Sequence, residues 1–147
     1  DMMTPAYGQS ELVKKLCAEF QTTDTCAVHV RGGDIVGPGR AFFERALVRM
    51  EKERPGLRYL VFTNDKEAAK EALEGEHTER KMTYISELGA FSDIDEFFLM
   101  AACRHQIISN SSYSTWAAYL NPNPEKVVIM PEYKGCEQIR LKEWIVL

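Results

Sequence analysis

Several features that would define a class of protein are missing from this sequence. No apolar run approaches the roughly 20 residues that a membrane-spanning helix needs. Lys and Arg form no basic cluster and the net charge is −4, which argues against non-specific binding to nucleic acid. The four cysteines contain no C-x-x-C pair and fit neither a zinc site nor a disulfide framework, so we expect buried free thiols. The redox compartment stays open.

The composition is instead that of an ordinary soluble globular domain. Hydrophobic residues make up 45% of the chain and charged residues 27%. A length of 147 residues suits one domain, over residues 1–147, with a core of its own. The N-terminal residues have neither the basic nor the apolar segment of a signal peptide. We therefore expect any membrane association to come from segments outside this chain, and the compartment is left open.

Hydrophobic periodicity predicts helices that alternate with strands. Apolar residues recur at helical spacing after Ser10, near residue 43, from residue 66, from Asp93 and around residue 116. Short β-rich runs lie at residues 25–31, 59–63, 82–85, 106–109 and 126–130. This alternation implies right-handed crossovers and a parallel sheet with helices on both faces. The predicted fold class is therefore α/β, a Rossmann-like domain, with Trp144 expected to dock the tail onto the body.

In such a sheet, ligands bind at the carboxyl ends of the strands, and the first of these ends is His29-Val30-Arg31-Gly32-Gly33-Asp34. Strand alternation directs His29 and Arg31 to the same side. The two glycines let a ligand approach the backbone, and the Arg31 guanidinium suits two phosphate oxygens. The alternative is a strand that ends in a turn, with Arg31 paired to Asp34. The motif alone does not decide between them.

The second such segment, Asn110-Ser111-Ser112-Tyr113-Ser114, lies between a strand and a helix. Hydroxyl groups and unpaired backbone N–H groups at a helix start form an anion site without a metal. Ordinary N-capping by Ser111 or Ser112 explains the same residues, and both interpretations can hold at once.

The third segment is Asp93-Ile94-Asp95-Glu96. An Asp-x-Asp pattern marks a manganese site in one class of sugar transferases. Here Asp93 and Glu96 stand where a helix capping box would put them, and no second cluster of ligands supports a metal. We therefore expect a helix start and no metal site, with Asp95 available as an acceptor for a nucleobase edge.

Taken together and in this order, these segments resemble glycosyltransferase family 11, the α-1,2-fucosyltransferases. The family pattern His-x-Arg-Arg-x-Asp is matched by residues 29–34, and the pair Asn64-Asp65 follows a hydrophobic strand as in the family. The most specific match runs from Phe98 to Ala118 and contains the Asn-Ser-Ser block. Two positions depart from the pattern: Gly32 replaces the second Arg, and Thr115 replaces the first Trp of a Ser-Trp-Trp run.

The resemblance implies a fold and a reaction. The fold would be the donor domain, the C-terminal half, of a two-domain GT-B-like enzyme. The reaction would transfer L-fucose from GDP-fucose to the 2-hydroxyl of a galactoside with inversion, without a metal or any other cofactor. The partners would be the GDP-fucose donor and a galactoside-terminated glycan acceptor. With Gly32 in place of an arginine, a non-catalytic GDP-sugar-binding module is the alternative.

The resemblance also implies roles for particular residues. Arg31 would hold the β-phosphate, His29 would assist at the diphosphate, and Asp34 is a candidate base on position only. Asp95 would pair with the guanine. The remaining residues of the expected donor site are Asn64, Asp65, Asn110, Ser111, Ser112 and Ser114.

Overall fold

The computed structural model describes residues 11–31, 39–73, 81–133, 141 and 143–147. Within these residues six strands form one parallel sheet, in the order β3-β2-β1-β4-β5-β6. The strands are β1 (Thr25–Val30), β2 (Arg58–Thr63), β3 (Lys81–Tyr84), β4 (His105–Ile107), β5 (Val128–Met130) and β6 (Ile145–Val146). The predicted Rossmann-like α/β fold is confirmed.

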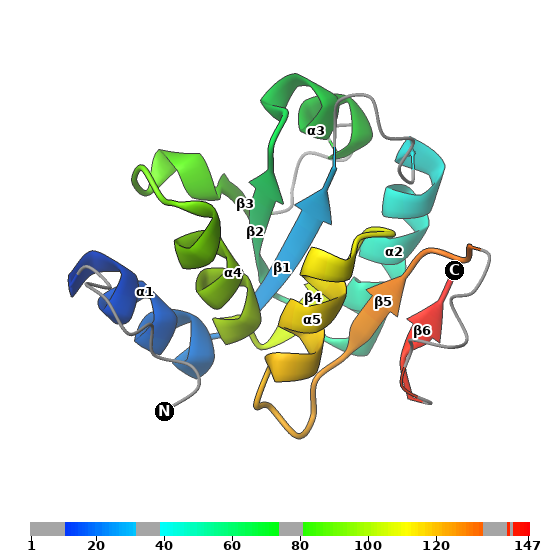
Figure 1. Cartoon of the computed structure of the whole chain (residues 1–147). Helices are drawn as coiled ribbons and strands as arrows, with labels where there is room; N and C mark the ends of the chain where they lie inside the picture. The colour runs from blue at the N-terminus through cyan, green and yellow to red at the C-terminus, as the bar shows by residue number, and fades with distance from the viewer. Residues whose placement is uncertain (1–10, 32–38, 74–80, 134–140, 142) are drawn as a thin grey trace.

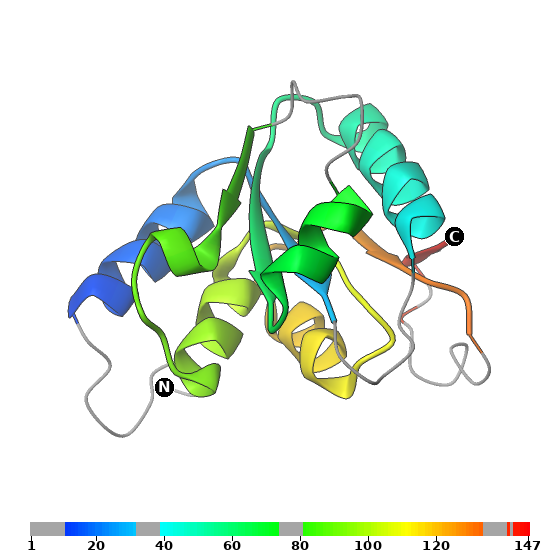
Figure 2. The same cartoon turned by 90° about the horizontal axis from the view of Figure 1, so that it is seen from above.

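Helices cover both faces of the sheet (Figures 1 and 2). On one face lie α2 (Arg40–Glu53) and α3 (Lys66–Leu73). On the other lie α1 (Glu11–Thr22), α4 (Asp93–Ala102) and α5 (Ser112–Leu120), and a short 3-10 helix, η1 (Ile85–Glu87), follows β3. None of the helices among the described residues is long and apolar enough to cross a membrane.

The apolar spacing in the sequence explains which face each helix buries. In α2, Phe43, Ala46, Leu47 and Met50 recur at helical spacing and are at most 1% exposed. Strand β1 is buried on both sides: Val28 packs with α2 and α3, whereas its neighbour Ala27 packs with the helices of the opposite face. Burial on both faces is why a parallel strand is apolar at nearly every position.

The order of the strands determines where a ligand site lies. From β1 the chain moves outward through β2 to β3, then returns by α4 to β4, on the other side of β1. The crossovers therefore leave β1 and β4 in opposite directions, which opens a crevice at the carboxyl ends of these strands. This is the topological switch point of the sheet.

Some boundaries differ from the prediction. Strand β4 covers His105–Ile107 rather than residues 106–109, and Ile85 belongs to η1 instead of extending β3. The expected cap at Ser10 lies outside the described residues. Of the expected thiols, Cys26 and Cys103 are buried and free, Cys17 is half-buried and free, and Cys136 lies outside the described residues.

The tail docks as expected and adds a strand that the sequence did not predict. Trp144 is 3% exposed, and its ring centroid lies 4.9 Å from that of Tyr119 on α5. Behind it, Ile145 and Val146 pair with β5 as β6. Two residues are too short a run to show strand alternation, so the pairing of this segment with β5 could not be predicted from the sequence.

Candidate functional site

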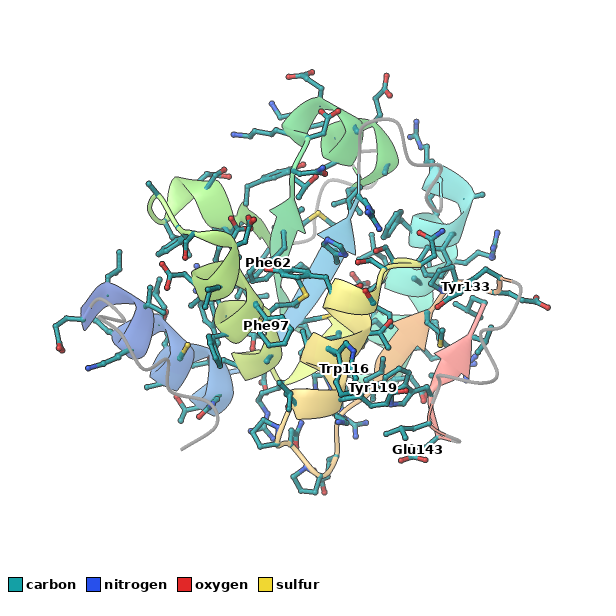
Figure 3. The ribbon with its side chains drawn as sticks, viewed as in Figure 1. Phe62, Phe97, Trp116, Tyr119, Tyr133 and Glu143 are labelled. Atoms are coloured by element: carbon teal, nitrogen blue, oxygen red, sulfur yellow. The ribbon has the colours of Figure 1, made fainter. Side chains whose placement is uncertain are left out.

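A cleft of about 360 Å³ opens at the carboxyl edge of the sheet, beside the switch point. Its lining comes from β1, the end of β2 and the starts of α4 and α5. The lining residues are His29, Arg31, Phe62, Thr63, Asn64, Asp93, Glu96, Ser111 and Tyr113. Phe62 of β2 and Phe97 of α4 belong to one apolar cluster on this face of the sheet (both are labelled in Figure 3). The size is within the range of sites for small organic ligands.

The end of β1 contributes the positive charge of the cleft. His29 and Arg31 both line it, as strand alternation requires. Burial, together with the nearby Arg31 charge, lowers the pKa of His29 to about 4. His29 is therefore neutral near pH 7, and the permanent charge comes from Arg31.

A chain of hydroxyl groups joins β1 to the loop after β4. His29 Nδ1 lies 2.8 Å from the Ser109 hydroxyl oxygen, which lies 3.4 Å from the hydroxyl oxygen of Ser114. Ser109 and Ser114 are fully buried. Ser114 therefore stabilises the loop between β4 and α5 through buried hydrogen bonds, and it does not line the cleft. Ser109 was not among the predicted site residues.

The start of α5 contributes backbone N–H groups and a cap. Ser111 is the N-cap, and its hydroxyl accepts a hydrogen bond of 3.2 Å from the Tyr113 N–H. Its carbonyl accepts one of 2.8 Å from the Thr115 hydroxyl. Ser111 also lines the cleft, so the capping and anion-site interpretations meet in one residue. Ser112 is exposed and Asn110 half-buried, and neither belongs to the lining.

The adjacent residues Asn64 and Asp65, after the end of β2, have different roles. Asn64 is exposed and lines the cleft, together with Thr63. Asp65 starts α3 instead: its carboxylate accepts a hydrogen bond of 3.1 Å from the Ala68 N–H, and its own N–H donates to the Thr63 hydroxyl at 3.0 Å. Asp65 does not line the cleft.

The capping box at the start of α4 differs from the one that the sequence predicted. Ser92 is the N-cap, and its hydroxyl accepts a hydrogen bond of 3.1 Å from the Asp95 N–H. The Asp95 carboxylate accepts the reciprocal bond from the Ser92 N–H at 3.4 Å. The box is thus Ser92 with Asp95, not Asp93 with Glu96, because a serine hydroxyl one residue earlier caps the helix.

This correction changes which carboxylates face the cleft. Asp93 and Glu96, three residues apart on one helix face, both line it, whereas Asp95 does not. Asp95 lies near Cys17 of α1 instead: burial, with the nearby Asp95 carboxylate, raises the pKa of the Cys17 thiol to about 11. Burial, with the nearby Asp93 carboxylate, raises the pKa of Glu96. The sequence analysis missed Asp93 and Glu96 as cleft residues, although their three-residue spacing was a signal.

Tyr113 joins the two sides of the cleft. Its hydroxyl donates a hydrogen bond of 2.7 Å to the Asp93 carbonyl, which ties the start of α5 to the start of α4. Its ring centroid lies 5.7 Å from that of His29 and 5.5 Å from that of Phe97. Tyr113 therefore contacts both the basic and the acidic side of the cleft. Asp34, the expected candidate base, lies outside the described residues.

A six-stranded parallel sheet with a cleft at its switch point, carrying an arginine and a capped helix start, defines an α/β domain suited to an anionic ligand. Residues 10–147 match the family described as Glycosyl transferase family 11. The chain belongs to that family, and the match supports a role in glycosyl transfer. It is 28% identical over 151 aligned positions to the O-antigen biosynthesis glycosyltransferase WbnK of Escherichia coli. The alignment covers 89% of this chain and 48% of that protein, so the chain spans about half the length of this curated relative.

Proposed function

We propose that this chain is the donor-binding domain of a GT-B-like α-1,2-fucosyltransferase. The enzyme would transfer L-fucose from GDP-fucose to the 2-hydroxyl of a galactoside, with inversion and without a metal. The observation that carries the proposal is that Arg31, His29 and the capped start of α5 line one cleft. Together they offer a positive charge and several hydrogen-bond donors at one place, which is what a diphosphate needs.

The chemistry that this arrangement would perform is stabilisation of the leaving group. Breaking the bond between fucose and GDP leaves negative charge on the β-phosphate. The Arg31 guanidinium, the N–H groups at the start of α5 and a hydrogen bond from His29 would meet that charge, as a metal ion does in other transferases. Losing one such donor typically lowers turnover by about 10²- to 10³-fold.

The acidic side of the cleft would recognise the nucleoside. A guanine presents N–H donors along one edge, and a carboxylate accepts them in pairs. The resemblance assigns this role to Asp95, but Glu96 and Asp93 are the carboxylates that line the cleft. We therefore favour Glu96 for the guanine edge, with Asn64, which lines the cleft, and the exposed Ser112 next to Ser111 as further polar contacts. Asp65, Asn110 and Ser114 would act by positioning the loops that bear them.

In the proposed two-domain enzyme, the acceptor would be bound mainly outside the donor-binding domain. The curated relative, about twice as long, is named for O-antigen biosynthesis, which supports a glycan as the acceptor, and the galactoside is what the family resemblance implies. Asp34 is the candidate, on sequence position, for the base that deprotonates the acceptor hydroxyl.

The proposal is tested by isothermal titration of the chain with GDP and GDP-fucose, with UDP as the comparison nucleotide. We expect both guanine nucleotides to bind, and Arg31→Ala to weaken GDP roughly 10- to 100-fold, since a hydrogen-bonded charge is lost. Arg49→Ala is the matched control, because Arg49 is exposed on α2 beside Glu53. An absence of heat at millimolar GDP would count heavily against the proposal. A large fall in the melting temperature of Arg31→Ala would indicate a structural role.

The alternative function is a GDP-sugar-binding module without turnover. It is favoured by Gly32, which removes a positive charge that the family pattern places beside the diphosphate. Incubating the full-length protein with GDP-fucose and a β-galactoside separates the two functions. Fucosylated product eliminates the alternative, whereas binding without product supports it.

A further inference from the structure

Ser109 is fully buried behind the cleft and has no role in the site proposed above, yet it makes the closest polar contact of His29. A neutral imidazole carries its proton on one ring nitrogen and accepts at the other, and the neighbours decide which. We propose that Ser109 is a positioning residue that fixes His29 as the tautomer with its proton on Nε2. His29 then acts in the cleft as a neutral hydrogen-bond donor and not as a base.

The lengths of the neighbouring hydrogen bonds favour one direction for this contact. The Ser114 hydroxyl donates its proton to the Ser111 carbonyl at 3.3 Å, and its oxygen accepts from the Ser109 N–H at 3.4 Å. The Ser109 hydroxyl proton then has two possible acceptors: His29 Nδ1 at 2.8 Å and the Ser114 oxygen at 3.4 Å. The shorter contact has the length of a good hydrogen bond, and the longer is at the limit for hydroxyl groups. Ser109 therefore donates to Nδ1, which leaves the ring proton on Nε2.

The surroundings of His29 support a neutral ring. Burial and the Arg31 charge lower its pKa to about 4. The other ionisable groups near it in the cleft are Tyr113 on α5 and the carboxylates of Asp93 and Glu96 on α4. Among the described residues, the structure gives Nε2 no hydrogen-bond partner. A protonated Nε2 at a cleft wall is a donor for an incoming anion.

The opposite tautomer would suit this cleft badly. It would place a lone pair of Nε2 toward the ligand, next to the oxygens of a diphosphate, and the two would repel. It would also leave the Ser109 proton with the 3.4 Å contact alone. The inference rests on the proposed function for the identity of the ligand. The tautomer itself follows from the geometry of β1 and the loop after β4.

The test measures the tautomer directly. Long-range ¹H–¹⁵N spectra of the full chain report which ring nitrogen of each histidine is protonated, and His29→Gln identifies the signals of His29. We expect a protonated Nε2 and an unprotonated Nδ1 at pH 7 in the wild type. A protonated Nδ1 with a free Nε2 would overturn the proposal.

Substitutions at Ser109 then show whether this residue is the cause. Ser109→Ala removes the hydroxyl, and we expect a mixture of tautomers together with a roughly three- to tenfold weaker Kd for GDP. Ser109→Cys has nearly the same size and a weak donor, so it should recover part of both properties. Ser86→Ala, at an exposed serine of η1, is the control and should change neither. Far-UV spectra confirm that each variant is folded. An unchanged tautomer in Ser109→Ala would contradict the proposal, even if the affinity falls.

The two proposals fail separately. A wild type with a protonated Nε2 that does not bind GDP keeps this inference and removes the proposed function. A wild type that binds GDP with a protonated Nδ1 keeps the function and removes the inference.

Discussion

Residues next to one another along the chain have different tasks around the cleft. On α4, Asp95 bonds to the Ser92 backbone, whereas Glu96, one position later, lines the cleft. On β1, Val30 is buried in the core between two cleft residues, His29 and Arg31. At this scale, helix rotation and strand alternation decide which side chain meets a ligand.

The two carboxylates of α4 give a paired prediction. Glu96→Gln should weaken GDP binding about tenfold or more, because a charged acceptor for the base is lost, and should leave UDP binding unchanged. Asp95→Asn should keep the GDP affinity and lower the free energy of unfolding by about 0.5–1 kcal/mol, through its place at the helix start. Calorimetry measures the first effect and urea denaturation the second. If Asp95→Asn weakens GDP and Glu96→Gln does not, the guanine role returns to Asp95.

Among the helices, α5 shows how one terminus serves stability and binding together. Its N-cap Ser111 accepts the Tyr113 N–H, while the Tyr113 hydroxyl holds the start of α4. The same N–H groups that need a cap are those that bind anions. The helix start is thus placed by contacts that exist without a ligand.

A pair of serine variants tests whether Ser111 caps the start of α5. Ser111→Ala should lower the free energy of unfolding by about 1 kcal/mol and also weaken GDP binding, because the cap and a cleft hydroxyl are lost together. Ser112→Ala should leave stability within about 0.5 kcal/mol, since Ser112 is exposed. Thermal melts with and without GDP measure both quantities. Equal destabilisation by the two variants would contradict the assignment of Ser111 as the cap.

At the scale of the whole molecule, the tail completes one edge of the sheet. The Leu147 N–H donates to the Met130 carbonyl and the Leu147 carbonyl accepts from the Glu132 N–H, so the last residues are tied along β5. Trp144 anchors this arrangement against Tyr119 (which is labelled in Figure 3). The tail therefore packs against the C-terminal part of α5 through Trp144.

The two tryptophans of the chain provide a matched test of this anchoring. Trp144→Ala should lower the free energy of unfolding by about 3–5 kcal/mol, because a large buried ring leaves a cavity. Trp116, on the outer face of α5, is 59% exposed, and Trp116→Ala should change stability by no more than about 0.5 kcal/mol. Urea denaturation of both variants measures the difference. Similar values for the two would show that the tail does not contribute to the fold.

Two histidines make the stability of the whole domain depend on pH. Burial, with nearby arginines, lowers the pKa of His29 and of His105 to about 4, and the His105 Nδ1 accepts a hydrogen bond of 2.9 Å from the Val127 N–H. Between about pH 6.5 and pH 4 the unfolded chain binds more protons than the folded one, so stability falls as the pH falls through this range. Each histidine adds at most about 1.4 kcal/mol per pH unit to the slope.

The pH dependence is measured by urea denaturation at intervals from pH 7 to pH 4. His29→Gln should reduce the change in the free energy of unfolding with pH by the contribution of one histidine, because glutamine does not titrate. The same variant at pH 7 provides the reference stability. A slope that His29→Gln leaves unchanged would show that His29 does not titrate below its usual range in the folded state.

Local patterns in the sequence predict the alternation of helices and strands, the parallel sheet and the strand ends at which a ligand site would lie. Periods of two and of about 3.6 residues are local properties, so the faces of α2 and β1 could be predicted without coordinates. Alternation also placed His29 and Arg31 together, and the serines at the start of α5 were a local helix signal.

Which of these residues contact one another depends on the packing of distant segments. Ser109 contacts His29 across 80 positions of the chain, and no local pattern contains that distance. The rotation of α4, set by its Ser92 cap and by packing against α1 and α5, turned Glu96 toward the cleft and Asp95 away from it. The strand of the tail likewise depends on the pocket that Trp144 fills, because two residues cannot specify a strand without the edge they pair with.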